Sequence, residues 1–230
     1  MRFLVTAGNT REKIDRVRDW GNIFTGNTGL RIARALTQAG EVDLLTSNAR
    51  HLEELPQAGP IRGRRFTNHA DLRDALSAMM KSVEYRAVFM TAAVSDYRPT
   101  GVYEILDRQV GEEGEVWRVR GVQAGKVKGS YPRVAVAGER TEKLVDLFRT
   151  EWAYRGFLVK FKLEVGVGAE ELIRIGEASR LASGADYLVA NTLEMVEGEG
   201  AGAYLLGGAS PEWVPRARLA ERMVELVRRV

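Results

Sequence analysis

The chain has 230 residues, of which 45% are hydrophobic and 28% charged, and it contains no cysteine. Such a composition is typical of a globular protein with a full hydrophobic core, and the lack of cysteine excludes disulfides, thiolate metal sites and a cysteine nucleophile. The net charge of +3 suits an anionic ligand but is too diffuse to indicate nucleic-acid binding. His51 and His69 lie in what we interpret as polar connecting segments, so a histidine-rich metal site is not expected.

Targeting signals are not evident. The amino terminus enters a strand pattern at Arg2–Val5 without the features of a signal peptide. No apolar run approaches the ~20 residues that span a bilayer. We therefore expect a cytoplasmic protein that does not bind a membrane.

Strand and helix patterns alternate through the first half of the chain. The apolar runs that predict buried strands are Phe3–Ala7, Val42–Thr46 and Ala87–Val94. The apolar faces that predict helices are Leu30/Ala33/Leu36/Ala39, ended by Gly40, and Leu72/Leu76/Met79, capped by Asn68. Strands separated by helices predict a parallel sheet with right-handed crossovers.

The middle of the chain lacks helix signals. Three strands are predicted there in succession, at Tyr103–Val110, Val116–Gln123 and Arg133–Ala137. A hairpin turn at Gly111–Gly114 and a second turn at Gly125–Ser130 separate them. We predict an antiparallel flap over residues 103–137 within a single domain of residues 1–230.

Alternation resumes after the flap. The predicted helices are one capped by Thr141 and running to Tyr154, one over Glu170–Ser183 stopped by Gly184, and a last one that begins at Pro215. The predicted strands are Phe157–Leu163, Tyr187–Ala190 and a short one within Ala201–Gly208.

The segment Thr91–Pro99 carries the first candidate site. It changes from a buried strand to small residues, then Ser95 and Asp96. Ligands of open α/β sheets bind at the carboxyl ends of strands, where Ala92 and Ala93 would admit a substrate and Asp96 would accept its hydrogen bonds. The alternative is a tight strand exit with Asp96 as a turn or helix cap.

The segment Asn22–Gly29 carries the second candidate site. Gly26 and Gly29 permit close backbone approach just before a long helix, whose free N–H groups attract phosphate, and Thr25 adds a hydroxyl. A simple glycine turn explains the pattern equally well. Arg11, Arg16 and Arg18 precede it, and one of them would meet a phosphate unless all three form a solvated loop.

Three later residues are candidates for the same site. Lys126 lies between glycines on the second turn and would either close over an anion or form an exposed hairpin tip. Asn191 ends a strand, where its amide would read a ligand or form a turn. Phe161 would stack on a base or pack into the core.

The order of these motifs resembles that of the phosphopantothenate–cysteine ligase (phosphopantothenoylcysteine synthetase) family. The segments that carry the resemblance are Val5–Thr10, Ile14–Arg18, Asn22–Gly29, Thr91–Tyr97, Lys126–Lys128, Phe161–Glu164 and Val189–Asn191. The resemblance implies a Rossmann-like homodimer that joins 4′-phosphopantothenate to cysteine in coenzyme A synthesis. ATP or CTP, with Mg²⁺, would activate the carboxylate as an acyl-nucleotidylate. No FMN is expected, because the flavin-dependent decarboxylase fused upstream in many bacterial members is absent.

The resemblance also implies roles for individual residues. Nucleotide binding would fall to Gly8, Thr25, Gly26, Gly29, Phe161 and Asn191. Phosphopantothenate binding would fall to Asn22, Ala92, Ala93 and Asp96, and to Arg18 reaching from the neighbouring subunit. Asn22, Asp96 and Lys126 would carry catalysis, with Lys126 stabilising the activated intermediate. The metal ligands are not identified.

Departures from the family cluster at the phosphate loop. Asn9 replaces a glycine, Phe24 a small serine and Asn27-Thr28 a more basic pair, whereas Phe161–Glu164 is more similar to the ATP-using branch. A non-catalytic nucleotide- or phosphopantetheine-binding homologue is therefore an alternative. A nicotinamide-dependent oxidoreductase is a second alternative, disfavoured because G-x-G-x-x-G is missing.

Overall fold

The computed structural model describes residues 1–122, 125–196, 198 and 200–229. Its centre is an eight-stranded sheet with the strand order β13-β12-β11-β10-β6-β1-β4-β5. The strands are β1 (Arg2–Ala7), β4 (Glu41–Thr46), β5 (Ile61–Arg65), β6 (Ala87–Met90), β10 (Phe157–Glu164), β11 (Tyr187–Thr192), β12 (Gly202–Leu206) and β13 (Glu212–Pro215). Within this sheet β11, β10, β6, β1, β4 and β5 run parallel, whereas β12 pairs antiparallel with β11, and β13 pairs antiparallel with β12. The predicted α/β class with a mainly parallel sheet is confirmed.

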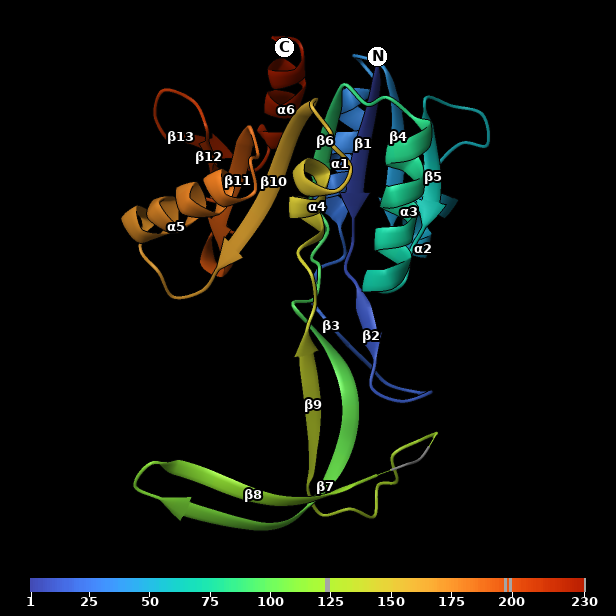
Figure 1. Ribbon diagram of the computed structural model, residues 1–230. Helices are drawn as coiled ribbons and strands as arrows, with labels where there is room; N and C mark the ends of the chain where they lie inside the picture. The colour runs from blue at the N-terminus through green and yellow to red at the C-terminus, as the bar shows by residue number, and fades with distance from the viewer. Residues whose placement is uncertain (123–124, 197, 199, 230) are drawn as a thin grey trace.

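Helices cover both faces of the sheet (Figure 1). The helices are α1 (Asn27–Leu36), α2 (Ala49–Glu53), α3 (His69–Ser82), α4 (Leu144–Thr150), α5 (Ala169–Ala182) and α6 (Leu219–Val227), with a 3₁₀ turn at Leu193–Met195. Side chains alternate along a strand, so Phe3 and Val5 pack with α1 and α6, whereas Leu4 packs with α3 and α4. None of the described helices is long and apolar enough to cross a bilayer.

A three-stranded antiparallel arm projects from this body (Figure 1). Its strands are β7 (Tyr97–Gly111), β8 (Gly114–Gly121) and β9 (Val134–Arg140), in the order β8-β7-β9. A small ribbon of β2 (Arg11–Lys13) and β3 (Asp19–Gly21) lies beside its base. The antiparallel excursion and its turn at 111–114 are confirmed, with wider bounds than predicted. Gln123, the predicted end of the middle strand, lies outside the described residues.

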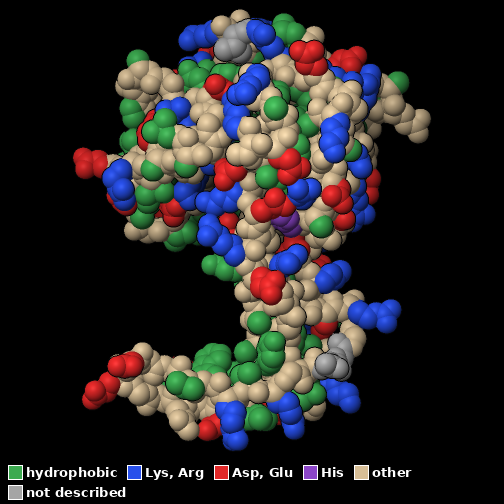
Figure 2. All heavy atoms as spheres, viewed as in Figure 1, with side chains coloured by type: hydrophobic (Ala, Val, Ile, Leu, Met, Phe, Trp, Pro, Cys, Tyr) green, Lys and Arg blue, Asp and Glu red, His purple; other side chains and the backbone are tan. Residues whose placement is uncertain are grey.

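The face seen in Figure 2 mixes basic and acidic side chains over the body, and the arm is a narrow projection below it. Several predicted boundaries are wrong, and the helix expected to run to Tyr154 is α4, which ends at Thr150. Strand β6 ends at Met90 rather than Val94, because the chain bends at Ala92; beyond the bend only an isolated parallel bridge joins Ala93 to Asn9, with Ala93 N donating to Gly8 O at 2.9 Å. Pro215 ends β13, and α6 starts only at Leu219. Thr141 does not cap α4, since its hydroxyl donates to Ser95 O at 2.7 Å.

The two histidines also differ from expectation. His51 lies in α2 and His69 is the first residue of α3, and both are buried. The connections that we expected at these positions are therefore helical.

The path of the chain leaves a crevice at one edge of the sheet. From β1 the chain first builds β4 and β5 on one side, and then β6, β10 and β11 on the other. The segments that leave β1 and β6 stay hydrogen-bonded to each other as far as Thr10 and Ser95, and they lie at the carboxyl ends of the strands, which is where open α/β sheets bind ligands. Gly8 follows β1 there and Thr91 follows β6.

Candidate functional site

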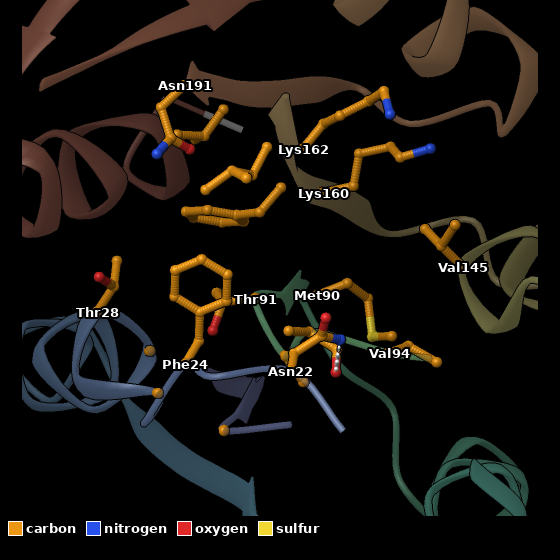
Figure 3. A pocket seen from close by; sticks show the side chains of 18 of the residues that line it. Asn22, Phe24, Thr28, Met90, Thr91, Val94, Val145, Lys160, Lys162 and Asn191 are labelled. Carbon is orange, nitrogen blue, oxygen red and sulfur yellow. Dashed lines mark hydrogen bonds between the residues drawn. The ribbon is translucent and has the colours of Figure 1, made fainter. Parts of the chain in front are cut away.

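A cavity of about 490 Å³ lies at the carboxyl ends of the central strands. The candidate residues that line it are Gly8, Asn22, Thr25, Gly26, Gly29, Ala92, Ala93, Asp96, Phe161 and Asn191. Figure 3 shows Asn191 across the cavity from Phe24 and Thr28, which come from the loop at 22–29. Two candidates, Arg18 and Lys126, are not among the lining residues. The fold thus brings together segments that are distant in the sequence.

Glycines let the loop at 22–29 pack directly on the ends of β1 and β6. Gly8 and Gly26 have φ of +88° and +81°. A Cβ on Gly26 would lie 2.0 Å from Gly8 N, and one on Gly29 would lie 2.4 Å from Thr91 Oγ1. Helix α1 starts directly after Gly26 without a side-chain cap or an acidic residue in its first turn. Its first N–H groups therefore suit a phosphate at the cavity wall.

Gly26→Ala is expected to lower the free energy of unfolding by several kcal/mol, well above the ~1–2 kcal/mol cost of a left-handed alanine alone. The excess arises because the Gly8 backbone must move. Gly166→Ala is the matched control, since Gly166 has φ +70° and open space around it. Urea unfolding of both variants measures the difference, and equal losses would contradict a close backbone contact.

Hydrogen bonds link the three loops around the crevice. Asn22 Nδ2 donates to Ala93 O at 3.3 Å, drawn dashed in Figure 3, and Asn9 Nδ2 donates to Asn22 O. Thr10 N also donates to Ala93 O, at 3.1 Å. This bonding orients the Asn22 amide beside the two alanines. Asn9, which departs from the family pattern, is therefore part of the link between the loops.

Asp96 is exposed at the cavity rim, directly before β7. It begins the arm rather than ending β6, which corrects the expectation that it terminates a strand. Among the described residues, its carboxylate accepts no hydrogen bond and forms no ion pair, so the capping interpretation finds no support. The carboxylate is free to meet a ligand.

Lys160 and Lys162 also line the cavity, and their side chains extend to the side away from Asn191 (Figure 3). Lys160 is buried, and its Nζ donates to Ser179 O, Ser179 Oγ and Ser183 Oγ at 3.0–3.1 Å. Burial lowers the pKa of Lys160 to about 8. Phe161 lines the cavity and also packs against the core beneath α1 and α6, so its core packing is confirmed, while stacking on a base stays a prediction.

The lowered pKa of Lys160 predicts a pH dependence of stability. Because the unfolded lysine holds its proton up to a pKa of 10.5, the unfolded chain binds more protons between pH 8 and 10.5, and stability should rise with pH there. Relative to Lys160→Met, the wild-type free energy of unfolding should increase across this window by at most about 3 kcal/mol. Urea unfolding at pH 8 and pH 10 measures it. Parallel pH profiles of the two proteins would contradict the burial of a charged lysine.

Arg18 and Lys126 lie together at the arm, outside the cavity of their own chain. Arg18 Nη2 donates to Val127 O at 2.8 Å. Asp15 accepts hydrogen bonds from Val127 N at 3.0 Å and from Arg18 N at 2.8 Å, and these backbone donors, led by Val127, hold the pKa of Asp15 below its usual range. Asp15 therefore ties the turn that carries Arg18 to the loop that carries Lys126, which is exposed.

A network of polar groups supports the loop at 22–29 through the buried side chains of Thr46 and His51, and sequence reasoning missed it. His51 Nδ1 contacts Thr46 Oγ1 at 3.0 Å, and His51 Nε2 contacts Asn27 Oδ1 at 3.1 Å. Asn48 Nδ2 donates to Thr25 O at 3.1 Å. Burial lowers the pKa of His51, which favours the neutral ring. The polar residues at the end of the strand Val42–Thr46 were the available signal.

Known proteins are similar to this chain in amino-acid sequence and in fold. Residues 1–108 match the family model of the DNA/pantothenate metabolism flavoprotein C-terminal domain. A coenzyme A biosynthesis bifunctional protein CoaBC from Thermococcus kodakarensis is 31% identical over 229 residues, which cover 96% of this chain and 49% of that protein. The CoaBC protein of Mycolicibacterium smegmatis is 38% identical over 103 residues, 44% of this chain and 24% of that protein. The chain spans about half the length, or less, of these relatives.

Solved structures extend the comparison over the whole chain. The DNA/pantothenate metabolism flavoprotein from Streptococcus pneumoniae has a TM-score of 0.82 and 28% identity, covering 100% of this chain and 99% of that one. A Cab2 mutant in complex with phosphopantothenate-cysteine has a TM-score of 0.67 over 99% of this chain and 86% of that one, but at 14% identity it supports the fold alone. The family resemblance of the ordered motifs is confirmed. The chain therefore carries a DNA/pantothenate metabolism flavoprotein C-terminal domain and is homologous to the CoaBC proteins.

Proposed function

We propose that the chain is a phosphopantothenate–cysteine ligase of coenzyme A biosynthesis, and that residues 1–230 act as one catalytic domain. The observation that carries the proposal is the convergence of the loops after β1 and β6 with the loop at 22–29 on one cavity of about 490 Å³. The homology to CoaBC proteins supports the same activity. The two substrates would be 4′-phosphopantothenate and cysteine, with ATP or CTP as the co-substrate.

The nucleotide would lie against Gly8, the start of α1 and Asn191. Gly8 and Gly26 leave the backbone open there, and the first N–H groups of α1 suit phosphate. Phe161 presents an aromatic ring from β10 at the same cavity, which suits a base. Asn191 lies in β11, one residue before the strand ends, where the side-chain amide would bond the base or ribose.

The acyl group would lie beside Asn22, Ala92 and Ala93. A substrate carboxylate oxygen attacks the α-phosphorus, pyrophosphate leaves, and the cysteine amine then displaces nucleoside monophosphate from the acyl carbon. This route needs positioned donors and cations rather than a protein nucleophile, in keeping with the lining of the cavity. The Asn22 amide, held by Ala93 O, is placed to orient the acyl oxygen.

The carboxylates around the cavity suit Mg²⁺ bound mainly through phosphate. Mg²⁺ in nucleotide sites is held by one or two carboxylates together with substrate phosphates. Asp96 and Glu142 line the cavity, but Glu142 is paired with Arg73 at 2.6 Å. Asp96 would therefore hold the metal, which would neutralise phosphate charge.

The site would be completed by a second copy of the chain. Arg18 and Lys126 lie outside their own cavity, so a role at phosphopantothenate or at the activated intermediate requires a neighbouring one. The arm also exposes large apolar side chains, with 72% of Val110, 70% of Val116 and 47% of Trp117 exposed. Such apolar exposure on strand edges favours a protein partner. We infer a homodimer that pairs through the arm.

The ligase activity and its acyl-nucleotidylate route are tested by analysing the products formed from an isotopically labelled substrate. The purified chain is incubated with Mg²⁺, ATP or CTP, cysteine and phosphopantothenate labelled with ¹⁸O in its carboxylate. An acyl-nucleotidylate route transfers one ¹⁸O to the nucleoside monophosphate and releases pyrophosphate, both seen by mass spectrometry. Release of nucleoside diphosphate would refute this mechanism. Asn22→Ala protein, purified identically, controls for contaminating activity.

A non-catalytic homologue is the competing function, because Phe24 directs its ring into the cavity at a position where the family has a small serine (Figure 3). Thermal shifts with ATP, CTP, NADPH and phosphopantothenate separate the alternatives, since a ligand of the native state raises the apparent melting temperature. Shifts with nucleotide or phosphopantothenate but no turnover would favour the non-catalytic homologue. A shift with NADPH alone would favour an oxidoreductase.

A further inference from the structure

A second hollow adjoins the cavity on the far side of the loop at 22–29. Its volume is about 540 Å³, and we call it the arginine pocket because Arg11 and Arg50 contribute to its wall. The other lining residues are Asn9, Asp19, Gly21, Asn22, Ile23, Phe24, Thr25, Ser47 and Asn48. Asn22, Phe24 and Thr25 line both spaces. A ligand that is longer than the first cavity can therefore extend past these three shared residues into the arginine pocket.

The arginine pocket carries positive charge that the protein does not neutralise. Within the described part of the chain, neither guanidinium forms a side-chain hydrogen bond or an ion pair. The acidic residue of this wall, Asp19, is paired with Lys13 at 2.8 Å. Two planar guanidinium groups without partners match the oxygen geometry of phosphate groups.

Backbone hydrogen bonds fix the main chain at both arginines, whose side chains are exposed. Arg11 lies in β2, paired with Gly21, and its N–H donates to Thr67 O at 2.9 Å. Arg50 lies in the first turn of α2, where its N–H donates to Asn48 Oδ1 at 3.2 Å. Some neutral polar groups of the wall already have partners, since Asn48 Nδ2 donates to Thr25 O and Ser47 Oγ donates to Asn9 Oδ1. The arginine side chains are the cationic groups of the wall that remain to receive an anion.

We propose that the arginine pocket binds the β- and γ-phosphates of the nucleotide and receives them as pyrophosphate, an inference that rests on the proposed ligase function. Asn22 lies between Ala93 O and this pocket. A carboxylate held beside Ala93 would attack the α-phosphorus from one side. The new O–P bond forms as the bond from that phosphorus to its bridging oxygen breaks, and the electron pair departs with pyrophosphate on the opposite side. Arg11 and Arg50 neutralise the charge that develops there.

The test is calorimetric binding to the full chain, with inorganic pyrophosphate and AMP as separate probes. Arg11→Gln and Arg50→Gln should each weaken pyrophosphate binding about tenfold, as expected for loss of a charge-assisted hydrogen bond. AMP lacks the β- and γ-phosphates, so its affinity should stay unchanged in both variants. Arg155→Gln is the matched control, because Arg155 is exposed in the connection from α4 to β10 and lines neither space. It should bind both probes as the wild type does.

Three results would overturn the assignment. They are no pyrophosphate binding by the wild type at millimolar concentration, unchanged pyrophosphate affinity in both variants, and an equal loss of AMP and pyrophosphate affinity, which would mean that the arginines only shape the shared wall. A chain that binds pyrophosphate through Arg11 and Arg50 but forms no phosphopantothenoylcysteine would refute the ligase function and leave the anion site standing.

Discussion

Asn22→Ala is expected to lower kcat/KM for phosphopantothenoylcysteine formation by about 10²-fold or more, the usual effect of removing a donor that stabilises developing charge. The amide is exposed, and its side chain donates one bond within the described residues, to Ala93 O at 3.3 Å. Loss of one exposed hydrogen bond should change the free energy of unfolding by no more than about 1 kcal/mol. The variant should therefore lose most of its kcat/KM while its free energy of unfolding stays close to that of the wild type.

Steady-state kinetics and urea unfolding of the same preparations check this result. Gln57→Ala is a suitable control, because it also removes an exposed amide but lies outside the cavity lining. The control should keep wild-type kcat/KM. If Asn22→Ala keeps it as well, the amide does not act on the acyl group, and the role that the family resemblance implies for it is wrong.

The elements predicted best are those whose pattern depends only on burial. Strands β1 and β4 are covered on both faces, so their sequences are mainly apolar, although the buried Asp43 interrupts β4. The cap of α3 was also predictable, because Asn68 Oδ1 accepts from Asp71 N at 2.8 Å within one turn. The helix cap depends on a local hydrogen bond, and the apolar pattern of the strands is common to any strand buried on both faces.

The strands that the sequence analysis missed are mostly exposed, so their sequences carry no pattern of buried apolar residues. Strand β5 is an edge strand whose arginines remain exposed, so Ile61–Arg65 carries no apolar alternation. Strands β2 and β3 are three residues long and mostly exposed. Their existence depends on pairing with each other, which a propensity argument does not contain.

The residues of the candidate site also fall into a group that the sequence could predict and a group that it could not. The glycine loop, Ala92-Ala93 and Asn191 were predictable, because strand ends of a parallel sheet meet at one edge. Arg50, His51 and Lys160 were not, since each acquires its role from a distant partner or cavity. Lys126 does not line the cavity of its own chain, and neither does Arg18, which was expected to act in a neighbouring one. Whether they serve a second chain is a question of assembly that the next experiment answers.

Mixing Arg18→Ala protein with Asn22→Ala protein is expected to restore activity that neither variant has alone. If Arg18 acts in the partner's site, a heterodimer combines both defects in one site and leaves the other intact. Random exchange of equal amounts makes half of the dimers hybrid, each with one working site, so about one quarter of wild-type activity should return. The contact of Arg18 Nη2 with Val127 O places it beside Lys126 on the arm, which agrees with action on a neighbour.

Native mass spectrometry verifies that the subunits exchange, and Arg155→Ala mixed with Asn22→Ala is the control. That mixture should lose activity in proportion to its Asn22→Ala content, because Arg155 lies outside the site. If activity stays absent in the Arg18→Ala mixture although hybrid dimers are present, Arg18 acts in the site of its own chain or has no role in the reaction. Because Asp15 bonds both Arg18 N and Val127 N, recovery would also make the arm loop, and Lys126 with it, part of the neighbouring site.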